Sequence, residues 1–341
     1  MLAEIESQPG ILAALQREAA DEVGSLAALI EKRRIGLVVL AARGTSDHAA
    51  IFGKYFLEYV TGLPVALAAP SIVTLYGRPL RLANALVIGL SQSGEAADVD
   101  EYLRAARAGG ALTAVITNDP GSTMARGAEH LLLCRAGVER AVAATKTYTA
   151  EMALLAMLGL ALAHDAGMRA EFDGLPGRLA EVLALEAEIR LRVQRYAFMR
   201  ECVVLARGFN QATALETALK IQETSHIGAK GYSAADFLHG PIAVLHPRYP
   251  ALVFAPSGAV LDGLLEIAGR VKEHGGELVV FSDAPRALAF GQTSFALPAV
   301  AEWMSPFTAI VAAQLFACFL AEAKGYDPDR PAGLAKVTVT R

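Results

Sequence analysis

The chain has 341 residues, of which 54% are hydrophobic and 19% charged, with a mean hydropathy of +0.37 and a formal net charge of −4. This length fits about two domains of ordinary size, and the composition is typical of a globular protein with large buried helices. The slight acidity, with a pI near 6.0, argues against nucleic acid and other polyanions as partners.

The N-terminal residues 1–6 are acidic and lack the basic and then apolar layout of a signal peptide. The longest apolar run, residues 152–163, ends at His164 and is shorter than the roughly 18–20 residues that a membrane-spanning helix needs. We therefore expect a cytoplasmic protein that does not cross a membrane.

Two loops in the first half of the chain follow short apolar runs that predict buried strands. The run 37–40 leads into Arg43-Gly44-Thr45-Ser46, and the run 85–90 leads into Ser91-Gln92-Ser93-Gly94-Glu95. Each loop is followed by a helical pattern, so the N–H groups at the helix start and the hydroxyls predict an anion site. Serine and glycine also build ordinary turns, which is the simpler interpretation of either loop alone. The two loops together predict one phosphate, most simply that of a sugar phosphate.

Neither loop has the glycine-lysine-serine ending or the G-x-G-x-x-G spacing of the common nucleotide-binding motifs. Nucleotide binding is therefore the less favoured use.

Residues 173–177 predict a linker, and an amphipathic helix follows as far as Arg195.

The second half of the chain repeats the first. The segment around Gly44 is echoed around Gly208, and the segment around Gly94 is echoed around Gly258, in both cases 164 residues later. Each copy alternates continuous apolar runs with longer helical patterns, as parallel sheets covered by helices on both faces do. We predict an α/β fold of two doubly wound parallel domains, with the ligand at the carboxyl ends of the strands.

Only the first copy keeps the full set of phosphate donors, because the second has Phe209-Asn210 in place of Thr45-Ser46 and Ala255-Pro256-Ser257 in place of Ser91-Gln92-Ser93. The second copy has a different set of polar residues. Glu216, Lys220 and Glu223 are spaced so that a helix would place all three on one face. An exposed face with ordinary ion pairs is the simpler interpretation of such a pattern. The position of this helix after a strand equivalent to 37–40 favours a site instead.

Two further residues are candidates for chemistry. His239 stands in a loop directly before Gly240-Pro241, where an imidazole could act as an acid or base, although a single loop histidine is more often inert. Lys336 lies in an apolar, β-branched C-terminal segment that we expect to pack against the body of the protein. A lysine withdrawn from water can attack a carbonyl group.

The cysteines and histidines predict neither a disulfide nor a metal site. Cys134, Cys202 and Cys318 are scattered among apolar residues, as reduced core cysteines are. The seven histidines show no metal-ligand spacing. We expect no metal and no cofactor.

Taken together, these motifs resemble the tandem sugar isomerase (SIS) domain proteins. The resemblance is greatest to the isomerase half of glucosamine-6-phosphate synthases and to isomerase-type glucosamine-6-phosphate deaminases. It covers nearly the whole chain and rests on an ordered set of motifs, namely residues 4–9, 44–46, 91–95, 144–146, 215–223, 239–241 and 334–339. It implies two flavodoxin-like three-layer αβα domains. We expect the first domain at 1–172, the second at 173–329 and a C-terminal tail at 330–341.

The resemblance also implies a role for each candidate residue. Glu223 would move the proton between C1 and C2, His239 would open the sugar ring from a neighbouring subunit, and Lys336 would engage the open-chain carbonyl. The implied supporting polar residues are Glu216 and Lys220, the phosphate ligands are Thr45, Ser46, Ser91, Gln92 and Ser93, and the backbone contacts to the sugar are Val142 and Ala335. The family usually forms homodimers.

The chain departs from the family pattern at two positions. Ala96 stands where the pattern has a threonine, which removes one phosphate hydroxyl, and Leu238 stands where a lysine usually precedes the histidine. The first change affects phosphate binding and the second affects substrate choice.

The synthases also carry a glutaminase domain, and no such segment precedes Glu4 here. We therefore expect the conversion of glucosamine 6-phosphate and water to fructose 6-phosphate and ammonia. The alternatives are a deaminase, deglycase or isomerase for another amino-sugar or fructosamine phosphate, and a non-enzymatic sensor of sugar phosphates.

Overall fold

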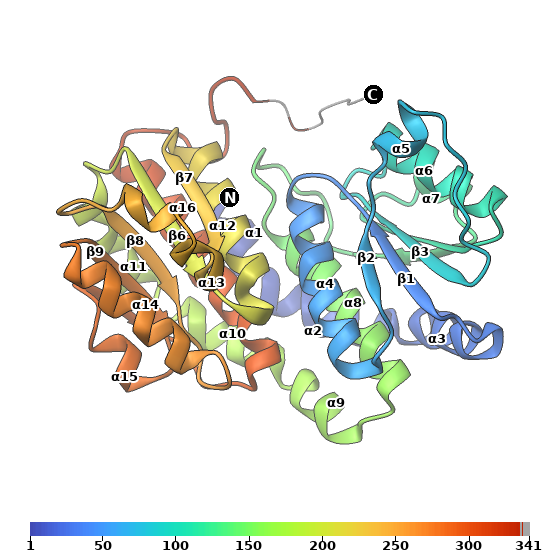
Figure 1. Ribbon diagram of the computed structural model, residues 1–341, viewed down its shortest axis with the longest axis horizontal. Coiled ribbons are helices and arrows are strands. Elements are labelled where there is room, and N and C mark those ends of the chain that lie inside the picture. Colours follow the sequence, from blue (N-terminus) through green and yellow to red (C-terminus); the bar gives the residue numbers. More distant parts are fainter. Residues whose placement is uncertain (335, 337–341) are drawn as a thin grey trace. The chain divides into compact units, whose positions relative to one another are not determined.

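The computed structural model describes residues 1–334 and 336, and the chain divides into two compact units (Figure 1). The N-terminal unit comprises residues 10–139 and 146–173 together with Lys336. The C-terminal unit comprises residues 1–9, 140–145 and 174–334. The cut after residue 173 lies next to the boundary expected at 172, whereas residues 1–9 and 140–145 group with the second copy because they pack against its elements.

The N-terminal unit is built on a five-stranded parallel sheet in the order β2-β1-β3-β4-β5. Its strands are β1 (Leu37–Ala41), β2 (Val65–Leu67), β3 (Ala85–Leu90), β4 (Leu112–Thr117) and β5 (His130–Leu133). Its helices are α2 (Gln8–Glu18, which begins in the other unit), α3 (Ala20–Arg33), α4 (Thr45–Thr61), α5 (Ser71–Thr74), α6 (Ala97–Ala108), α7 (Thr123–Gly127), α8 (Lys146–Ala163) and α9 (Ala166–Asp173). All residues of β3 and β4 are buried, which explains their continuous apolar sequences.

The C-terminal unit repeats this plan with the order β7-β6-β8-β9-β10. Its strands are β6 (Glu201–Ala206), β7 (Gly228–Ser233), β8 (Pro250–Phe254), β9 (Glu277–Ser282) and β10 (Thr293–Ala296). Its α-helices are α1 (Leu2–Glu6), α10 (Leu175–Leu183), α11 (Glu186–Val193), α12 (Gln211–Ser225), α13 (Ala234–Leu238), α14 (Leu261–Glu273), α15 (Pro285–Leu288) and α16 (Ser305–Ala323), and its 3₁₀ turns are η1 (Gln194–Tyr196), η2 (Gly208–Asn210), η3 (Pro241–Val244) and η4 (Glu302–Met304).

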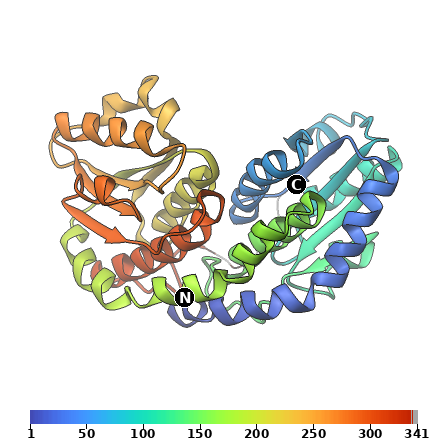
Figure 2. The same ribbon diagram turned by 90° about the horizontal axis from the view of Figure 1, so that it is seen from below.

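Each sheet is covered by helices on both faces. In the C-terminal unit, α14 packs on one face through Leu264, Ile267 and Val271. On the other face, Phe281 of β9 contacts Phe316 of α16, with ring centroids 5.9 Å apart. Figure 2 shows these layers, with orange α14 on one side of the strands and red α16 on the other. The predicted fold of two doubly wound αβα domains is confirmed.

Among the described residues, the helical stretch Glu302–Ala323 is long and apolar enough to cross a membrane. Its apolar part is, however, wholly buried inside the protein. It corresponds to α16, which packs against α10, α11 and α12. A helix that is apolar on all sides is expected in the core of a large α/β domain.

The segment 173–177, which the sequence predicts as a linker, contains the start of α10. The amphipathic helix expected as far as Arg195 is divided into α10, α11 and η1.

Candidate functional site

The two predicted loops follow adjacent strands of the N-terminal unit. Strands β1 and β3 pair in parallel, with Ala41 opposite Gly89, so the segments after them begin side by side at the carboxyl edge of the sheet. Gly44 has a φ of 57° and caps α4, whose first residues are Thr45 and Ser46. The first loop therefore ends directly at the N-terminus of a 17-residue helix, a position that favours anions.

The second loop turns tightly at Gly94. The Gly94 N–H lies 3.1 Å from both the backbone oxygen and the Oγ of Ser91. Gly94 has a φ of 63°, and a Cβ there would lie 2.0 Å from the Oγ of Ser122, so only glycine fits. Ser91 is buried, whereas Gln92 and Ser93 are half-buried and accessible at this edge.

The hydroxyl of Ser46 has a partner within the unit. Its Oγ lies 2.8 Å from Oε1 of Glu151 on α8, and both side chains are buried. A serine hydroxyl has one proton, so Ser46 donates it either to this carboxylate or to a bound anion. Sequence reasoning missed Glu151, although a glutamate inside an otherwise apolar helix is a signal that could have identified it.

Arg43 adds a positive charge beside the first loop. Its Nε and one terminal nitrogen each lie 2.7 Å from Oδ2 of Asp98, in the first turn of α6. The Arg43 side chain is 51% exposed while Asp98 is 4% exposed. The buried carboxylate thus orients a guanidinium that keeps other N–H groups directed to solvent, and this residue was also missed as a candidate.

Glu216, Lys220 and Glu223 form a buried cluster on α12, as their spacing predicts. The Nζ of Lys220 lies 3.2 Å from Oε1 of Glu216 and 2.6 Å from Oε2 of Glu223. The side chains of Glu216 and Lys220 are 0% and 1% exposed, and that of Glu223 is 23% exposed. This burial excludes an ordinary solvent-exposed ion-pair face.

The electrostatics of this cluster keep Lys220 charged. Burial alone lowers the pKa of Lys220, but the nearby Glu216 and Glu223 carboxylates together outweigh it and raise the pKa above its ordinary value. A permanent ammonium group between two carboxylates fixes the orientation of both. Glu223 is the member that also reaches solvent, which suits a group that exchanges a proton with a ligand.

His239 lies directly after α13 and is exposed. Its backbone N–H lies 3.0 Å from the oxygen of Asp236, and the next residue, Gly240, has a φ of 129°. The chain therefore turns sharply after the histidine. Within residues 1–334 and 336, the imidazole has no hydrogen-bond partner.

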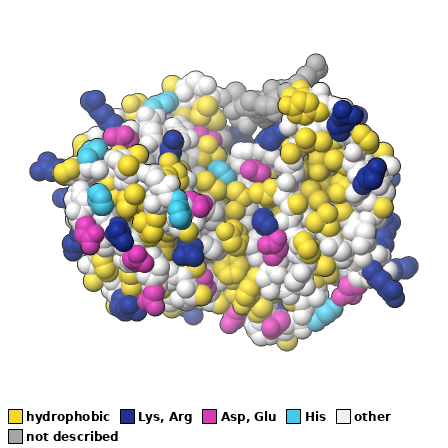
Figure 3. All heavy atoms as spheres, in the orientation of Figure 1, with side chains coloured by type: hydrophobic (Ala, Val, Ile, Leu, Met, Phe, Trp, Pro, Cys, Tyr) yellow, Lys and Arg dark blue, Asp and Glu magenta, His cyan; other side chains and the backbone are white. Residues whose placement is uncertain are grey.

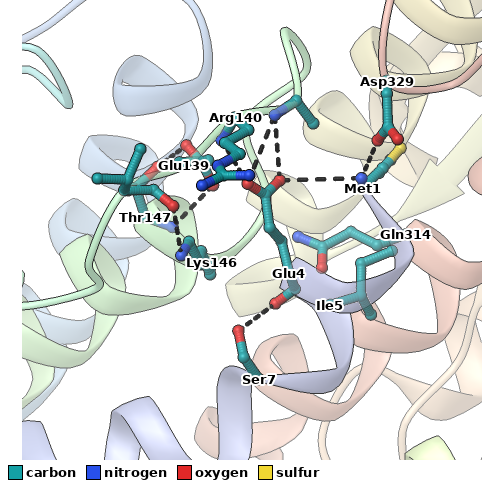
Figure 4. A network of polar contacts seen from close by, with 12 residues as sticks. Met1, Glu4, Ile5, Ser7, Glu139, Arg140, Lys146, Thr147, Gln314 and Asp329 are labelled. Carbon is teal, nitrogen blue, oxygen red and sulfur yellow. Dashed lines mark hydrogen bonds and ion pairs between the residues drawn. The ribbon is translucent and has the colours of Figure 1, made fainter.

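Val142 lies in the 140–145 segment of the C-terminal unit. At the start of this segment the Glu4 carboxylate accepts the N–H of Ala141 at 3.3 Å, and the Val142 N–H lies 3.3 Å from the oxygen of Asp329. Glu4 also accepts the backbone N–H of Arg140, and Figure 4 shows these two residues together. Because the Val142 N–H is already bonded, any sugar contact at this residue would use its carbonyl oxygen.

Lys336 contacts a carboxylate that the sequence analysis missed. Its Nζ lies 3.3 Å from Oε2 of Glu139, whose side chain is 0% exposed. Glu139 also accepts the N–H of Thr147 at 3.2 Å and its hydroxyl at 2.6 Å, and Figure 4 shows these two residues together. The predicted contact Ala335 lies outside the described residues. An acidic residue shortly before the motif 144–146 was the available signal for Glu139.

The candidates are thus divided between the units. The hydroxyl loops and the Glu139–Lys336 pair belong to the N-terminal unit, and the α12 cluster, His239 and Val142 belong to the C-terminal unit. Among the residues that the structure describes, no group of three or more His, Cys, Asp or Glu side chains could hold a metal ion.

Comparison with known proteins matches two parts of the chain, residues 29–161 and 199–321, to the SIS domain. These ranges contain the two sheets and most of their helices. The 164-residue repeat of the sequence is therefore a repeat of this domain.

Among curated proteins, the chain is 35% identical to a glutamine–fructose-6-phosphate aminotransferase (isomerizing) of Gloeobacter violaceus, over 99% of this chain and 58% of that protein. The chain thus spans little more than half the length of this relative. Among solved structures, the C-terminal domain of a glucosamine-fructose-6-phosphate aminotransferase from Francisella tularensis superposes with a TM-score of 0.90 and 28% identity, covering 97% of this chain and 98% of that one. A protein assigned as a phosphosugar isomerase from Silicibacter pomeroyi superposes with a TM-score of 0.87 and 33% identity, covering 96% and 98%.

Proposed function

From the premise that the chain belongs to the SIS domain family, we propose that it is a phosphosugar isomerase that deaminates an amino sugar. The proposed reaction converts glucosamine 6-phosphate and water to fructose 6-phosphate and ammonia. The names of the Gloeobacter violaceus and Francisella tularensis proteins include fructose 6-phosphate and an amino-group transfer, which supports an amino sugar as the substrate.

The observation that carries the proposal is the buried cluster of Glu216, Lys220 and Glu223. An isomerase must remove a proton from one carbon and return it to the next, which needs one fixed carboxylate. Glu223 is held at 2.6 Å by an ammonium group that is itself buried, and it is the part of the cluster that a ligand could reach. A surface ion pair would leave the carboxylate free to rotate and give no such precision.

The chemistry then follows in balanced steps. In the open-chain amino sugar, Glu223 takes the proton from C2 while O1 takes a proton from water, which gives an enolamine with a hydroxyl at C1. Glu223 then returns its proton to C1 as the amine gives one proton back to water, which leaves a C=N bond at C2. Water adds to C2 and ammonia departs, giving the 2-ketose. When this chain is assayed alone with water as co-reactant, the nitrogen leaves as ammonia.

The loops of the N-terminal unit would hold the phosphate of this substrate. Ser91, Gln92 and Ser93, with Thr45 and the N-terminus of α4, offer neutral donors, and Arg43 adds a charged one. Ser46 would join them on releasing Glu151. Binding energy gained at a phosphate remote from the reacting carbons positions those carbons for reaction.

The remaining roles follow the family resemblance. His239 would open the ring by moving a proton between ring oxygen and O1, and its exposed imidazole is free to do so. Lys336 would engage the C1 carbonyl, and its contact with Glu139 keeps its ammonium group in a defined place. Val142 and Ala335 would add backbone contacts to the sugar.

We further propose that the protein works as a cytoplasmic homodimer whose sites lie at the subunit interface. An exposed apolar surface over α4, β2 and α5 supports an interaction between subunits, as Figure 3 shows on this face. Its large side chains are Tyr55, Tyr59, Leu67, Ile72, Leu75 and Tyr76. Light scattering of the purified protein should give twice the chain mass, and a monomer would contradict the proposal.

The function is tested by incubating the protein with a panel of hexose and hexosamine phosphates and following ammonia and ketose together. We expect equal amounts of ammonia and fructose 6-phosphate from glucosamine 6-phosphate. Turnover of only another amino-sugar phosphate would replace the substrate. Binding without turnover in freshly prepared protein would indicate a sensor.

A further inference from the structure

A cavity opens at the amino edge of the C-terminal sheet and contains none of the residues assigned above to the proposed reaction. It has a volume of about 460 Å³ and is lined by Arg195, Phe198, Arg248 and Glu277. Glu277 begins β9, Arg248 lies shortly before β8, and the other two residues lie in the connection that leads into β6. A volume of this size is typical of pockets that hold small-molecule ligands.

Phe198 presents its aromatic ring to solvent from a backbone that is fixed. The residue is 58% exposed, whereas the next residue, Met199, is 1% exposed. The Nζ of Lys324 donates to the carbonyl oxygens of Ala197 and Met199, on either side of the phenylalanine, at 3.1 and 2.7 Å. The Met199 N–H also bonds the oxygen of the buried Tyr196 at 2.9 Å. The exposed ring therefore belongs to a fixed turn.

A carboxylate at the start of β9 orients the first of the two arginines. The Nε of Arg195 donates to Oε1 of Glu277. The Glu277 side chain is 10% exposed and that of Arg195 is 57% exposed. The nearly buried carboxylate thus fixes the direction of a guanidinium group that reaches solvent.

The second arginine, Arg248, has a backbone conformation that favours glycine. Its φ is 69°, in the left-handed region that is costly for residues with a Cβ. Its N–H donates to the oxygen of Gly275 at 2.7 Å, which ties the turn before β8 to the turn before β9. Within the part of the chain that the structure describes, its exposed guanidinium makes no hydrogen bond or ion pair. An unpaired cation carried by a strained residue at the wall of a cavity indicates a binding role.

These features together select one class of ligand. The lining has two guanidinium groups and one carboxylate, so its charge balance is positive although the chain has a formal net charge of −4. Guanidinium groups bind phosphate oxygens through paired hydrogen bonds. A phenyl ring held in place stacks on the face of a nucleobase. Inorganic phosphate alone would leave Phe198 unused.

We propose that this cavity binds a nucleoside phosphate, with the base on Phe198 and the phosphate groups on Arg248 and Arg195. The site is separate from the loops at Gly44 and Gly94, which lack nucleotide-binding motifs. It lies wholly within the C-terminal unit, and it does not rest on the proposed function.

The test is calorimetric titration of the full chain with ADP, UDP and inorganic pyrophosphate. Both nucleotides should bind with one molecule per chain, because stacking tolerates different bases. We expect both to bind at least tenfold more tightly than pyrophosphate, which has no base to stack. Pyrophosphate binding as tight as that of the nucleotides would show only a basic surface and would overturn the inference.

Two variants with matched controls locate the site. Arg248→Gly removes the guanidinium at a position where glycine adopts the observed φ without strain, and should weaken ADP binding by about 10- to 100-fold. Arg81→Ala, at an exposed arginine of the N-terminal unit, should leave it unchanged. Phe198→Ala should weaken ADP binding by about tenfold, whereas Leu191→Ala, at a residue of α11 that is 75% exposed, should have no effect.

Failure of both ADP and UDP to bind would overturn the inference, as would equal ADP affinity in Arg248→Gly and Arg81→Ala. Ser93→Ala, in a loop assigned to the sugar phosphate, should bind ADP as the unchanged protein does. Loss of ADP binding in Ser93→Ala would assign the nucleotide to the N-terminal unit and would also overturn it.

Discussion

Helices α4 and α12 occupy the same place in the two copies, yet they use their polar residues in different ways. In α4 the polar residues are hydroxyls at the N-terminus, and its Lys54–Glu58 ion pair is exposed, with both side chains at least 36% accessible. In the second copy Phe209 and Asn210 stand at the positions of Thr45 and Ser46, and a buried ammonium group bridges two carboxylates farther along α12.

The difference shows how one scaffold can be given two roles. A helix N-terminus binds anions because its N–H groups are unsatisfied, so few changes are needed to make or remove a phosphate site there. A buried Glu–Lys–Glu cluster requires that the helix face around its ammonium group be enclosed by neighbouring elements, and α12 packs against α16 and β7. The first copy has the helix N-terminus with hydroxyls, which few substitutions can create. The second copy has the buried cluster, which depends on the packing of the surrounding core.

The largest effect on kcat is expected in the α12 cluster, and the exposed pair of α4 serves as the comparison. Glu223→Gln should lower kcat by about 10²- to 10⁴-fold, the usual contribution of a positioned general base, and leave substrate affinity largely unchanged. Steady-state assays of ammonia release together with calorimetric titration measure both quantities. Glu58→Gln on α4 is the control and should leave kcat unchanged. A loss of affinity with normal kcat would contradict the assigned role.

The next effect concerns stability. Lys220→Met leaves the buried Glu216 and the partly exposed Glu223 without their cation and should cost about 3–5 kcal/mol of unfolding free energy. Lys54→Met breaks an exposed pair and should cost about 1 kcal/mol or less from its charge. Urea unfolding of both variants gives the two values, and similar losses would show that the α12 cluster is not effectively buried.

The pH dependence of stability follows from the same lysine. The folded-state pKa of Lys220 lies above its ordinary value of 10.5, so its stabilising contribution is fully present below pH 10.5 and is lost as the pH rises through the folded-state pKa. The stability difference between the unchanged protein and Lys220→Met should be constant near neutral pH and shrink in strong alkali. A difference that grows with rising pH would have the wrong sign.

A smaller effect is expected at Glu139. Glu139→Gln should lower kcat by about 10- to 100-fold, because hydrogen bonds to charged groups contribute about 1.5–3 kcal/mol, while phosphate affinity is retained. Thr147→Val removes a donor to Glu139 but leaves its charge, and should have the weaker effect. If both variants change KM and kcat alike, Glu139 has only a structural role.

The smallest effect compares the matching serines of the two copies. Ser93→Ala should weaken binding of the sugar phosphate by about fivefold, as loss of one hydrogen bond contributes about 1 kcal/mol, and should leave kcat nearly unchanged. Ser257→Ala, in the matching loop of the second copy, should change neither. Calorimetric titration distinguishes them, and equal losses of affinity would show that both copies hold substrate.

The sequence was sufficient for features that depend on local spacing. The apolar runs and the 164-residue repeat predicted both sheets, and the spacing of Glu216, Lys220 and Glu223 predicted their common face. These patterns follow from helix and strand geometry, which acts over a few residues.

Contacts between distant segments were not predictable in this way. Ser46 and Glu151 are 105 residues apart, and Glu139 and Lys336 are 197 residues apart. No periodicity links such pairs, because only the folded core brings them within hydrogen-bond distance. The Arg195–Glu277 pair was missed for the same reason, since its members are 82 residues apart in the chain.

The strip of residues 140–145 has a consequence for how this protein can be divided. Its backbone is held by Glu4 and Asp329 in the C-terminal unit, although the residues on either side of it belong to the N-terminal unit. The polypeptide therefore passes back and forth between the units, and no single cut releases either half with all its own parts. We therefore expect fragments cut at residue 173 to fold poorly when expressed separately and to regain structure when expressed together.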